Sequence, residues 1–427
     1  MSLASADAAL SARSLPPLGL VALVAPYGDD GHHAQRYARL GWESVAVTLP
    51  HAALPAAYRV AADPLGGHAK VLVHRSVRRT VKKLRARGVH SVVAAGGLGV
   101  DLADRLTRVL ELPGNEPATS ALRTDRAVQA AALAAMGLAA PRGLRTSSLA
   151  TALRWAEHAG FPAYVVTAAD SATPFPGAVC TRAHEIRAAW RRQRSAAVHH
   201  SGSGDLVIQE RISGQQFVVH TVTNPDTGEH TVTALWAELR TRDGIHGRSD
   251  LLEKNSVLGR ALTSYLWRAL TVLGVESGAA RCRIAFTQQR GPVLMTARAY
   301  ARTTPAEDMC ERQAAGTDHV QAAVHARIAG RPVPSPAGQR RYVARVSLIA
   351  PHTGVLDRRL LRTLTTLPTV AGTVGLAAVG TPLVRTVDRA TSPGEIILAA
   401  SARQTIEEDY RVIRLIENSG LYEGTVS

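Results

Sequence analysis

Cysteine, lysine and aromatic residues are scarce in this chain of 427 residues. Its three cysteines, Cys180, Cys282 and Cys310, are widely spaced and form no Cys-x-x-Cys pair, which excludes a recognisable disulfide framework or zinc knuckle and favours a reducing compartment. Aromatic residues make up only 4% of the chain, but hydrophobic residues make up 46%. The length is therefore sufficient for a large core and for about three structural units.

The sequence also has no segment typical of a signal peptide or a membrane helix. Its beginning, Met1–Arg13, contains Asp7 and no basic region followed by an apolar one. The longest uncharged stretch, Thr363–Val384, is interrupted by proline and glycine, which favours strands and turns. We therefore expect a cytoplasmic protein without a membrane partner.

Positive charge is in excess, with 50 Lys+Arg against 34 Asp+Glu and a net charge of +16. Arginine dominates, because the chain has only four lysines. The densest basic stretch, Arg75–Arg87, has Val77, Val81 and Leu84 at helical spacing. The basic side chains of such a helix either bind the phosphates of a nucleic acid, as in a tRNA-binding protein, or form a face exposed to solvent. No aromatic residue lies between the charges for base stacking, so we favour the solvated face and consider nucleic acid an unlikely partner.

Short apolar runs between helical segments predict an α/β organisation at the start of the chain. The Gly96–Gly99 turn then leads into a helix near Val100. It lacks the Lys of a P-loop and the third glycine of a dinucleotide fingerprint, which favours a purely structural turn. The strands expected in this region are Leu18–Ala25, Ser44–Leu49, Val71–His74 and Val89–Ala95.

The middle of the chain predicts helices followed by β-hairpins. Apolar spacing indicates one helix over Ser120–Met136 and another over Leu149–His158. The turn at Asn224–Gly228 indicates a hairpin. The strands expected here are Ala163–Val166, Leu206–Gln209, Phe217–Thr223, His230–Glu238, Arg281–Phe286 and Val293–Met295.

Motifs for metal binding and nucleophilic catalysis are incomplete. His184–Ala188 begins like a helical zinc motif but has no second histidine. The pairs His32–His33 and His199–His200 have no carboxylate or thiolate companions, and Cys310 has no context that would activate it. We therefore expect no metal site.

Several stretches follow one another in order along nearly the whole chain, and together they resemble one family, the ATP-grasp carboxylate–amine ligases and in particular the L-amino-acid ligase-like group. The resemblance rests on Val92–Asn115, Ala121–Arg126, Phe161–Pro162, Asp170–Ala172, Val207–Thr223, Gly291–Leu294, Thr386–Asp388, Ser392–Gly394 and Asp409–Tyr422.

This resemblance implies an α/β protein with α+β lobes, namely an ATP-grasp fold with an N-terminal Rossmann-like domain and a C-terminal extension. The expected units are an N-terminal domain at 1–115, a small lobe at 116–206, a large lobe at 207–335 and the extension at 336–427. In that family two β-rich lobes clamp Mg-ATP, a substrate carboxylate attacks the γ-phosphate, and an amine then displaces phosphate.

The positions that correspond to the family's phosphate-binding lysines lack lysine here. One falls on Val166 or Thr167, and the other on Arg126, which keeps the charge. On the hinge strand Gln209 and Glu210 retain polar groups that can meet adenine.

The ribose and magnesium contacts depart further from the family. The ribose-binding glutamate corresponds to Gln216, and the two magnesium carboxylates correspond to Arg283 and Thr296, with Arg298 and Tyr300 nearby. A guanidinium repels Mg²⁺ and offers it no lone pair.

Our preferred hypothesis is a repurposed enzyme or pseudoenzyme that has lost ordinary Mg-ATP chemistry and kept the cleft, with no cofactor assigned. Arg281, Arg283 and Arg298 would then bind an anionic, amino-acid-like or peptide ligand, with His220 or Glu210 as proton-transfer groups. The resemblance points to bacterial specialised metabolism, with a pathway protein or a second copy of the chain as a possible partner. Whether the protein is an enzyme stays open.

The alternative is an active ATP-dependent ligase that uses ATP and Mg²⁺ through relocated contacts. Arg126 and Lys254 would supply the charge, and Asp170, Asp250 or Glu253 would reach the metal.

Ordinary structural roles remain open for the same residues. Arg281 and Arg283 are then solvent-exposed or paired with Glu276, and His220 is a half-buried histidine with its hydrogen bonds satisfied. In this interpretation the remaining candidates are residues of the core or of ordinary strands, namely Thr167, Phe217, Trp236 and Thr296.

Overall fold

The computed structural model describes residues 18–27, 32–59, 67–174, 176–241, 244–329 and 341–423. The expectation for Met1–Arg13 and the domain boundary at residue 335 lie outside these residues. Within them, no helix is both long and apolar enough to cross a membrane.

The N-terminal unit is a parallel four-stranded sheet covered by helices, as the alternating apolar runs predict. Its strands are almost uniformly apolar because both faces of the sheet are covered. In the order of the sheet the strands are β3 (Lys70–Val73), β2 (Trp42–Thr48), β1 (Gly19–Val24) and β4 (Ser91–Ala94), and the helices are α1 (His32–Arg39), α2 (Ala56–Arg59), α3 (Val77–Arg85) and α4 (Val100–Leu110).

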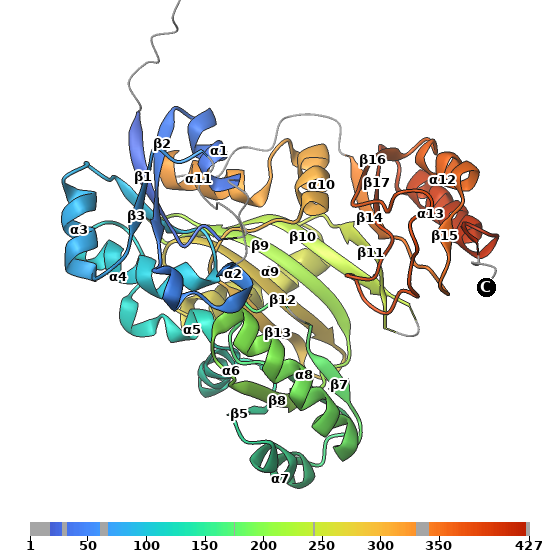
Figure 1. Ribbon diagram of the computed structural model, residues 1–427, viewed down its shortest axis with the longest axis horizontal. Helices are drawn as coiled ribbons and strands as arrows, with labels where there is room; N and C mark the ends of the chain where they lie inside the picture. The colour runs from blue at the N-terminus through green and yellow to red at the C-terminus, as the bar shows by residue number, and fades with distance from the viewer. Residues whose placement is uncertain are drawn as a thin grey trace, which may run out of the picture.

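The second unit is a small antiparallel sheet with helices on it, which lies below the large sheet in Figure 1. The sheet contains β5 (Gly143–Thr146), β8 (Leu206–Glu210), β6 (Tyr164–Ala168) and β7 (Ala178–Cys180) in that order. The helices are α5 (Ala121–Thr124), α6 (Arg126–Ala135), α7 (Leu149–Ala159) and α8 (Ala183–Ser201).

The single helix expected over Ser120–Met136 is wrong, because the chain breaks at Asp125. Asp125 has an extended backbone and caps α6 by accepting hydrogen bonds from the N–H groups of Ala127 and Val128. It also forms an isolated antiparallel bridge with Asp170. The capping carboxylate therefore overrides the continuous apolar spacing.

The third unit is built on an antiparallel eight-stranded sheet. Its last three strands come from the C-terminal part of the chain, which lies at the right in Figure 1. In order, the strands are β13 (Gly291–Arg298), β12 (Gly278–Thr287), β9 (Gln215–Thr223), β10 (His230–Arg240), β11 (His246–Leu251), β14 (Tyr342–Ser347), β17 (Glu395–Ala400) and β16 (Val370–Val374).

The helices of the third unit are α9 (Val257–Val272), α10 (Pro305–Ala315), α11 (His319–Ala329), α12 (Arg358–Thr365) and α13 (Arg403–Asn418), and β15 (Val355–Leu356) pairs with β18 (Tyr422–Glu423). The division of the chain at residues 115, 206 and 335 stays a prediction.

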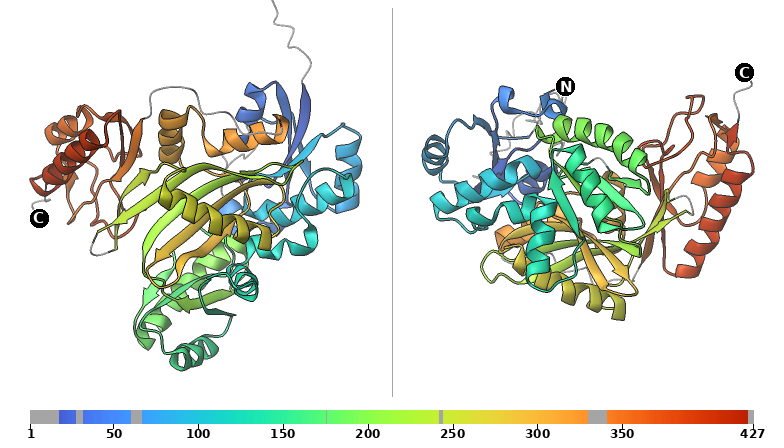
Figure 2. Two further views of the ribbon diagram at one scale, coloured as in Figure 1. Left: turned by 180° about the vertical axis from the view of Figure 1, so that it is seen from behind. Right: turned by 90° about the horizontal axis from the view of Figure 1, so that it is seen from below.

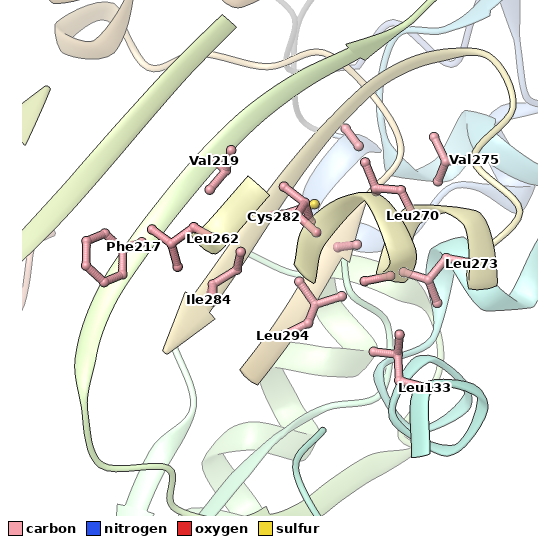
Figure 3. Packing of buried hydrophobic residues seen from close by; sticks show 14 of the residues in the cluster. Leu133, Phe217, Val219, Leu262, Leu270, Leu273, Val275, Cys282, Ile284 and Leu294 are labelled. Atoms are coloured by element: carbon pink, nitrogen blue, oxygen red, sulfur yellow. The ribbon is translucent and has the colours of Figure 1, made fainter. Parts of the chain in front are cut away.

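The two faces of the large sheet have different coverings. Helix α9 crosses one face in the view from behind in Figure 2, and its leucines pack on Phe217, Cys282 and Ile284 (Figure 3). We call the opposite face the inner face. Helix α10 covers its middle around Val218 and Trp236, and α11 covers the end nearest the N-terminal unit. Because side chains alternate along strands, every second residue of β9, β12 and β13 belongs to the inner face.

Leu266 of α9 tests the core on the other face, since it is fully buried there. We expect Leu266→Ala to lower the free energy of unfolding by about 2–5 kcal/mol, through lost apolar burial and a residual cavity. Val257→Ala on the same helix is the matched control, because Val257 is 78% exposed. Its effect should stay within about 0.5 kcal/mol. Urea unfolding followed by circular dichroism measures both, and equal losses would contradict this packing.

Candidate functional site

The inner face of the large sheet gathers most of the residues that the resemblance singles out. In the strand register Arg283 lies opposite Thr296, and Arg281 lies opposite Arg298. Gln216 lies opposite Glu238 on the neighbouring pair of strands. The polar residues on this face are thus Gln216, His220, Glu238, Arg281, Arg283, Thr296 and Arg298.

The guanidinium of Arg283 forms an ion pair with Glu238, so Arg283 is not an unpaired cation. Glu238 is 8% exposed and also contacts Arg240 at 3.4 Å. Burial raises the pKa of Glu238, but the facing Arg283 and other cations outweigh it and lower that pKa to about 2. The carboxylate is therefore ionised at neutral pH, and the charge of Arg283 is matched within the protein.

Arg126 and Arg298 meet at one main-chain oxygen. Arg298 Nε donates to the carbonyl of Ser171 at 2.6 Å, and Arg126 Nη2 donates to the same oxygen at 3.3 Å. Their remaining bonds also go to carbonyls, from Arg298 to Thr173 at 3.1 Å and from Arg126 to Asp170 at 3.4 Å. Neither guanidinium contacts a carboxylate within the described part of the chain.

The pKa values of Arg126 and Arg298 are both lowered, because the two like charges are largely removed from water. Burial, together with the nearby charge of Arg298, lowers the pKa of Arg126 to about 9, while Asp170 opposes the shift. Burial also raises the pKa of Asp170, and the two arginines act against that rise. The cluster thus has two cations and one carboxyl in addition to the matched Arg283–Glu238 pair.

The loop Asp170–Thr173 joins the small lobe to both other units at this point. Ala172 sits against Gly97 so closely that a Cβ atom on Gly97 would lie 2.0 Å from the Cβ of Ala172. The side chains of Thr173 and Thr296 are 2% and 8% exposed, and neither hydroxyl has a hydrogen-bond partner. The loop Asp170–Thr173 therefore packs against the Gly96–Gly99 turn. The hydroxyls of Thr173 and Thr296 are buried polar groups without a hydrogen-bond partner.

The small-lobe candidates lie on neighbouring strands. Thr167 in β6 and Gln209 in β8 are buried. Glu210 accepts hydrogen bonds from the main chain and side chain of Arg142 and from Arg290 at 2.8 Å. Burial raises the pKa of Glu210, but the hydrogen bonds from Arg142 and Arg290 together lower it by more. The net shift of this pKa is therefore downward. The roles of all three residues as ATP contacts stay predictions. Gln216, the ribose candidate, makes a long bond of 3.4 Å to the carbonyl of Gly214.

His220 is fully buried beneath α10 and α11. Its Nε2 accepts a hydrogen bond from Arg281 Nε at 3.1 Å, so Nδ1 carries the proton and donates to Glu311 Oε1 at 2.7 Å. Burial lowers the pKa of His220 to about 3. Arg281 is paired with Glu307 rather than with Glu276. The proton-transfer role of His220 stays a prediction, although the structure gives both ring nitrogens a partner inside the protein.

Two of the groups expected in the alternative ligase hypothesis, Asp250 and Lys254, have other partners within the protein. Asp250 is held at 2.6 Å by Arg248, which also binds Glu407 of α13. Lys254 donates to the carbonyl of Val232. Within residues 18–423, leaving aside the stretches not described, no group of three His, Cys, Asp or Glu side chains is arranged to hold a metal ion.

Sequence reasoning missed Glu238 as the partner of Arg283, although a signal for it exists. The turn at Asn224–Gly228 fixes the register of β9 and β10, and this register places Glu238 beside Gln216 on the inner face. Glu307 and Glu311 gave no such signal, because α10 reaches the sheet only through tertiary packing.

No protein-family model matches the chain, and no curated protein matches it.

Solved structures, in contrast, are similar over almost the entire chain. An L-amino acid ligase from Bacillus licheniformis has a TM-score of 0.68 at 14% identity, covering 94% of this chain and 98% of the ligase. A carboxyaminoimidazole ribonucleotide synthase from Aspergillus clavatus, solved with ATP, has a TM-score of 0.65 at 12% identity, with coverages of 94% and 98%. PurK, an N5-carboxyaminoimidazole ribonucleotide synthetase solved with ADP, has a TM-score of 0.64 at 11% identity, with coverages of 95% and 98%. The chain therefore has the ATP-grasp fold of the carboxylate–amine ligases, as the succession of its sequence phrases predicts.

Proposed function

We propose that this ATP-grasp protein binds a small anionic ligand, an amino-acid-like carboxylate or a phosphate, at Arg126 and Arg298, and that it does not perform ordinary Mg-ATP ligation. The single observation that carries the proposal is the carbonyl oxygen of Ser171, which accepts hydrogen bonds from both guanidinium groups. Two cations share one neutral acceptor there.

An anion is a better partner for these groups than a carbonyl. Hydrogen bonds between guanidinium and carboxylate or phosphate are charge-assisted, and they are roughly twice as strong as bonds between neutral groups. The hydroxyls of Thr173 and Thr296 are additional donors without partners. A ligand oxyanion that reached this place would satisfy both kinds of group and reduce the repulsion between the two arginines.

The residues do not fit a magnesium site of the family's kind. Arg283 stands where the resemblance places one metal carboxylate, and it has no lone pair to offer. Thr296 stands at the other position and brings a hydroxyl in place of a charged oxygen. Glu238 also brings a carboxylate to this face, but that carboxylate is paired with Arg283. We therefore derive no phosphoryl-transfer step through ATP and Mg²⁺.

The similar structures guide the choice of ligand. One of them is an L-amino acid ligase, which makes amino acids and short peptides the natural candidates for the anionic ligand. Amino acids carry the carboxylate that a pair of arginines recognises. An active ligase with relocated contacts is the competing possibility, and it requires ATP binding that depends on Mg²⁺.

Removing one guanidinium tests the ligand site. We expect Arg298→Gln or Arg126→Gln to weaken the binding of inorganic phosphate and acetate by about tenfold or more, because each loses a charge-assisted bond. Isothermal titration calorimetry measures the affinity. Arg187→Gln on α8 is the matched control, since Arg187 is an exposed arginine of the unit that also contains Arg126. Equal affinities in all three variants would contradict the assignment.

The pH dependence of stability tests the Arg283–Glu238 pair. The folded-state pKa of Glu238, about 2, lies below the ordinary value of 4.5. Its contribution to stability is therefore fully present above about pH 4.5 and is lost as the pH falls toward 2. We expect Arg283→Met to lower the free energy of unfolding by about 1–3 kcal/mol at pH 7, and this difference from the unmodified protein should shrink between pH 4.5 and 2.

Urea unfolding across the pH series measures the difference, in which the titration of other carboxyls cancels. The single variant Glu238→Gln and the double variant Glu238→Gln/Arg283→Met complete the double-mutant cycle. A difference that is absent at pH 7, or that does not change at low pH, would show that Arg283 is not the counter-charge of Glu238.

A further inference from the structure

A cavity of about 60 Å³ lies between the N-terminal unit and the large sheet. Its walls come from β4 and α4 on one side and from α11 and the start of β12 on the other. At about 10–15 Å³ for each water-sized group, it has room for about four to six such groups. This is the size of a small molecule rather than of a nucleotide.

Arg327 of α11 lines this cavity without a carboxylate partner in the described part of the chain. It donates to the hydroxyl of Ser277 at 2.8 Å and to the carbonyl of Val92 at 2.9 Å. Burial lowers the pKa of Arg327, and the more distant Tyr37 and Asp226 oppose this shift. The guanidinium thus brings a positive charge to the cavity and has only neutral acceptors in contact.

Tyr37 of α1 lines the same cavity and is 1% exposed. Its hydroxyl has no hydrogen-bond partner among the residues that the structure describes. Tyrosine hydroxyls inside proteins usually have a partner, so this one can donate to a group that enters the cavity. Burial raises the pKa of Tyr37 to about 12, and Arg327 acts in the opposite direction. The phenol is therefore protonated at neutral pH and available as a donor.

Asn115 adds further donors to the cavity. Its Oδ1 accepts hydrogen bonds from the N–H groups of Glu276 and Ser277, each at 2.9 Å, so its amide N–H groups remain to donate. Asp104, which also lines the cavity, is committed to Arg123 at 2.8 Å and to Ser120 at 2.6 Å. Donors without acceptors are therefore in excess in this space.

From this excess we infer that the cavity is a binding site for a small oxyanion of up to about five heavy atoms, such as a carboxylate or phosphate group, held by Arg327, Tyr37 and Asn115. A cation is a poor fit, because the one carboxylate in the wall is already paired. An apolar ligand would leave the Tyr37 hydroxyl and the Asn115 amide without an acceptor and the charge of Arg327 unmatched.

The three donors come from different parts of the fold, so the ligand would join them. Tyr37 and Asn115 belong to the N-terminal part of the chain, and Arg327 belongs to the helix that lies between the two sheets. A bound oxyanion would therefore stabilise the docking of the N-terminal unit on the large sheet. Neither Arg126 nor Arg298 lines the cavity, and the inference does not depend on the proposed function.

The test uses a background in which the other anion site is removed. Inorganic phosphate and acetate are titrated by calorimetry into the Arg126→Gln/Arg298→Gln double variant, and then into the same variant carrying Tyr37→Phe. We expect binding to persist in the double variant and to weaken about tenfold on loss of the Tyr37 hydroxyl, a group whose removal leaves the ring packing unchanged. Arg327→Lys should weaken binding further.

Two results would overturn the inference. One is the absence of phosphate and acetate binding in the double variant, and the other is binding that neither Tyr37→Phe nor Arg327→Lys changes. Either result would mean that the cavity holds water only. Binding that is lost with Tyr37→Phe but unaffected by the Arg126 and Arg298 substitutions would support this site and argue against the proposed function, so the two failures can be told apart.

Discussion

An arginine that leaves water needs a partner for its charge, and this requirement organises the inner face of the eight-stranded sheet. Three arginines there are matched by carboxylates that arrive from β10, α10 and β17. Arg298 on this face and Arg126 of α6 have only carbonyl oxygens in contact, and they meet at Ser171. The matched ion pairs are Arg281–Glu307, Arg283–Glu238, Arg345–Glu307 and Arg345–Glu395.

The distribution of charge on this face differs from the one that the resemblance to the ATP-grasp ligases implies. The fold is that of the ATP-grasp ligases over nearly the entire chain, and Arg283 and Thr296 stand where the resemblance in sequence implies metal-binding carboxylates. An arginine on a packed sheet needs a counter-charge, and Glu238 supplies one to Arg283 through an ion pair.

The sequence predicts the strands well, because their apolar runs and turns are local signals. It fails at Asp125, where a capping carboxylate interrupts an otherwise continuous helical pattern. In the site, the strand register is sufficient to place Arg283 near Glu238, but the contact of Arg298 with Ser171 depends on how the small-lobe loop folds over the sheet. Contacts of that kind arise from tertiary packing, which spacing along the chain does not encode.

The central claim is that the inner face holds anions directly and no longer holds Mg-ATP. Calorimetric titration of the full chain with ATP, with and without Mg²⁺ and with ADP as the nucleotide lacking the γ-phosphate, tests it most directly. The account predicts no increase in ATP affinity on adding Mg²⁺. Magnesium-dependent binding in the micromolar range, about −8 kcal/mol, with a clear preference for ATP over ADP, would contradict the claim and show that the metal contacts have moved to other residues.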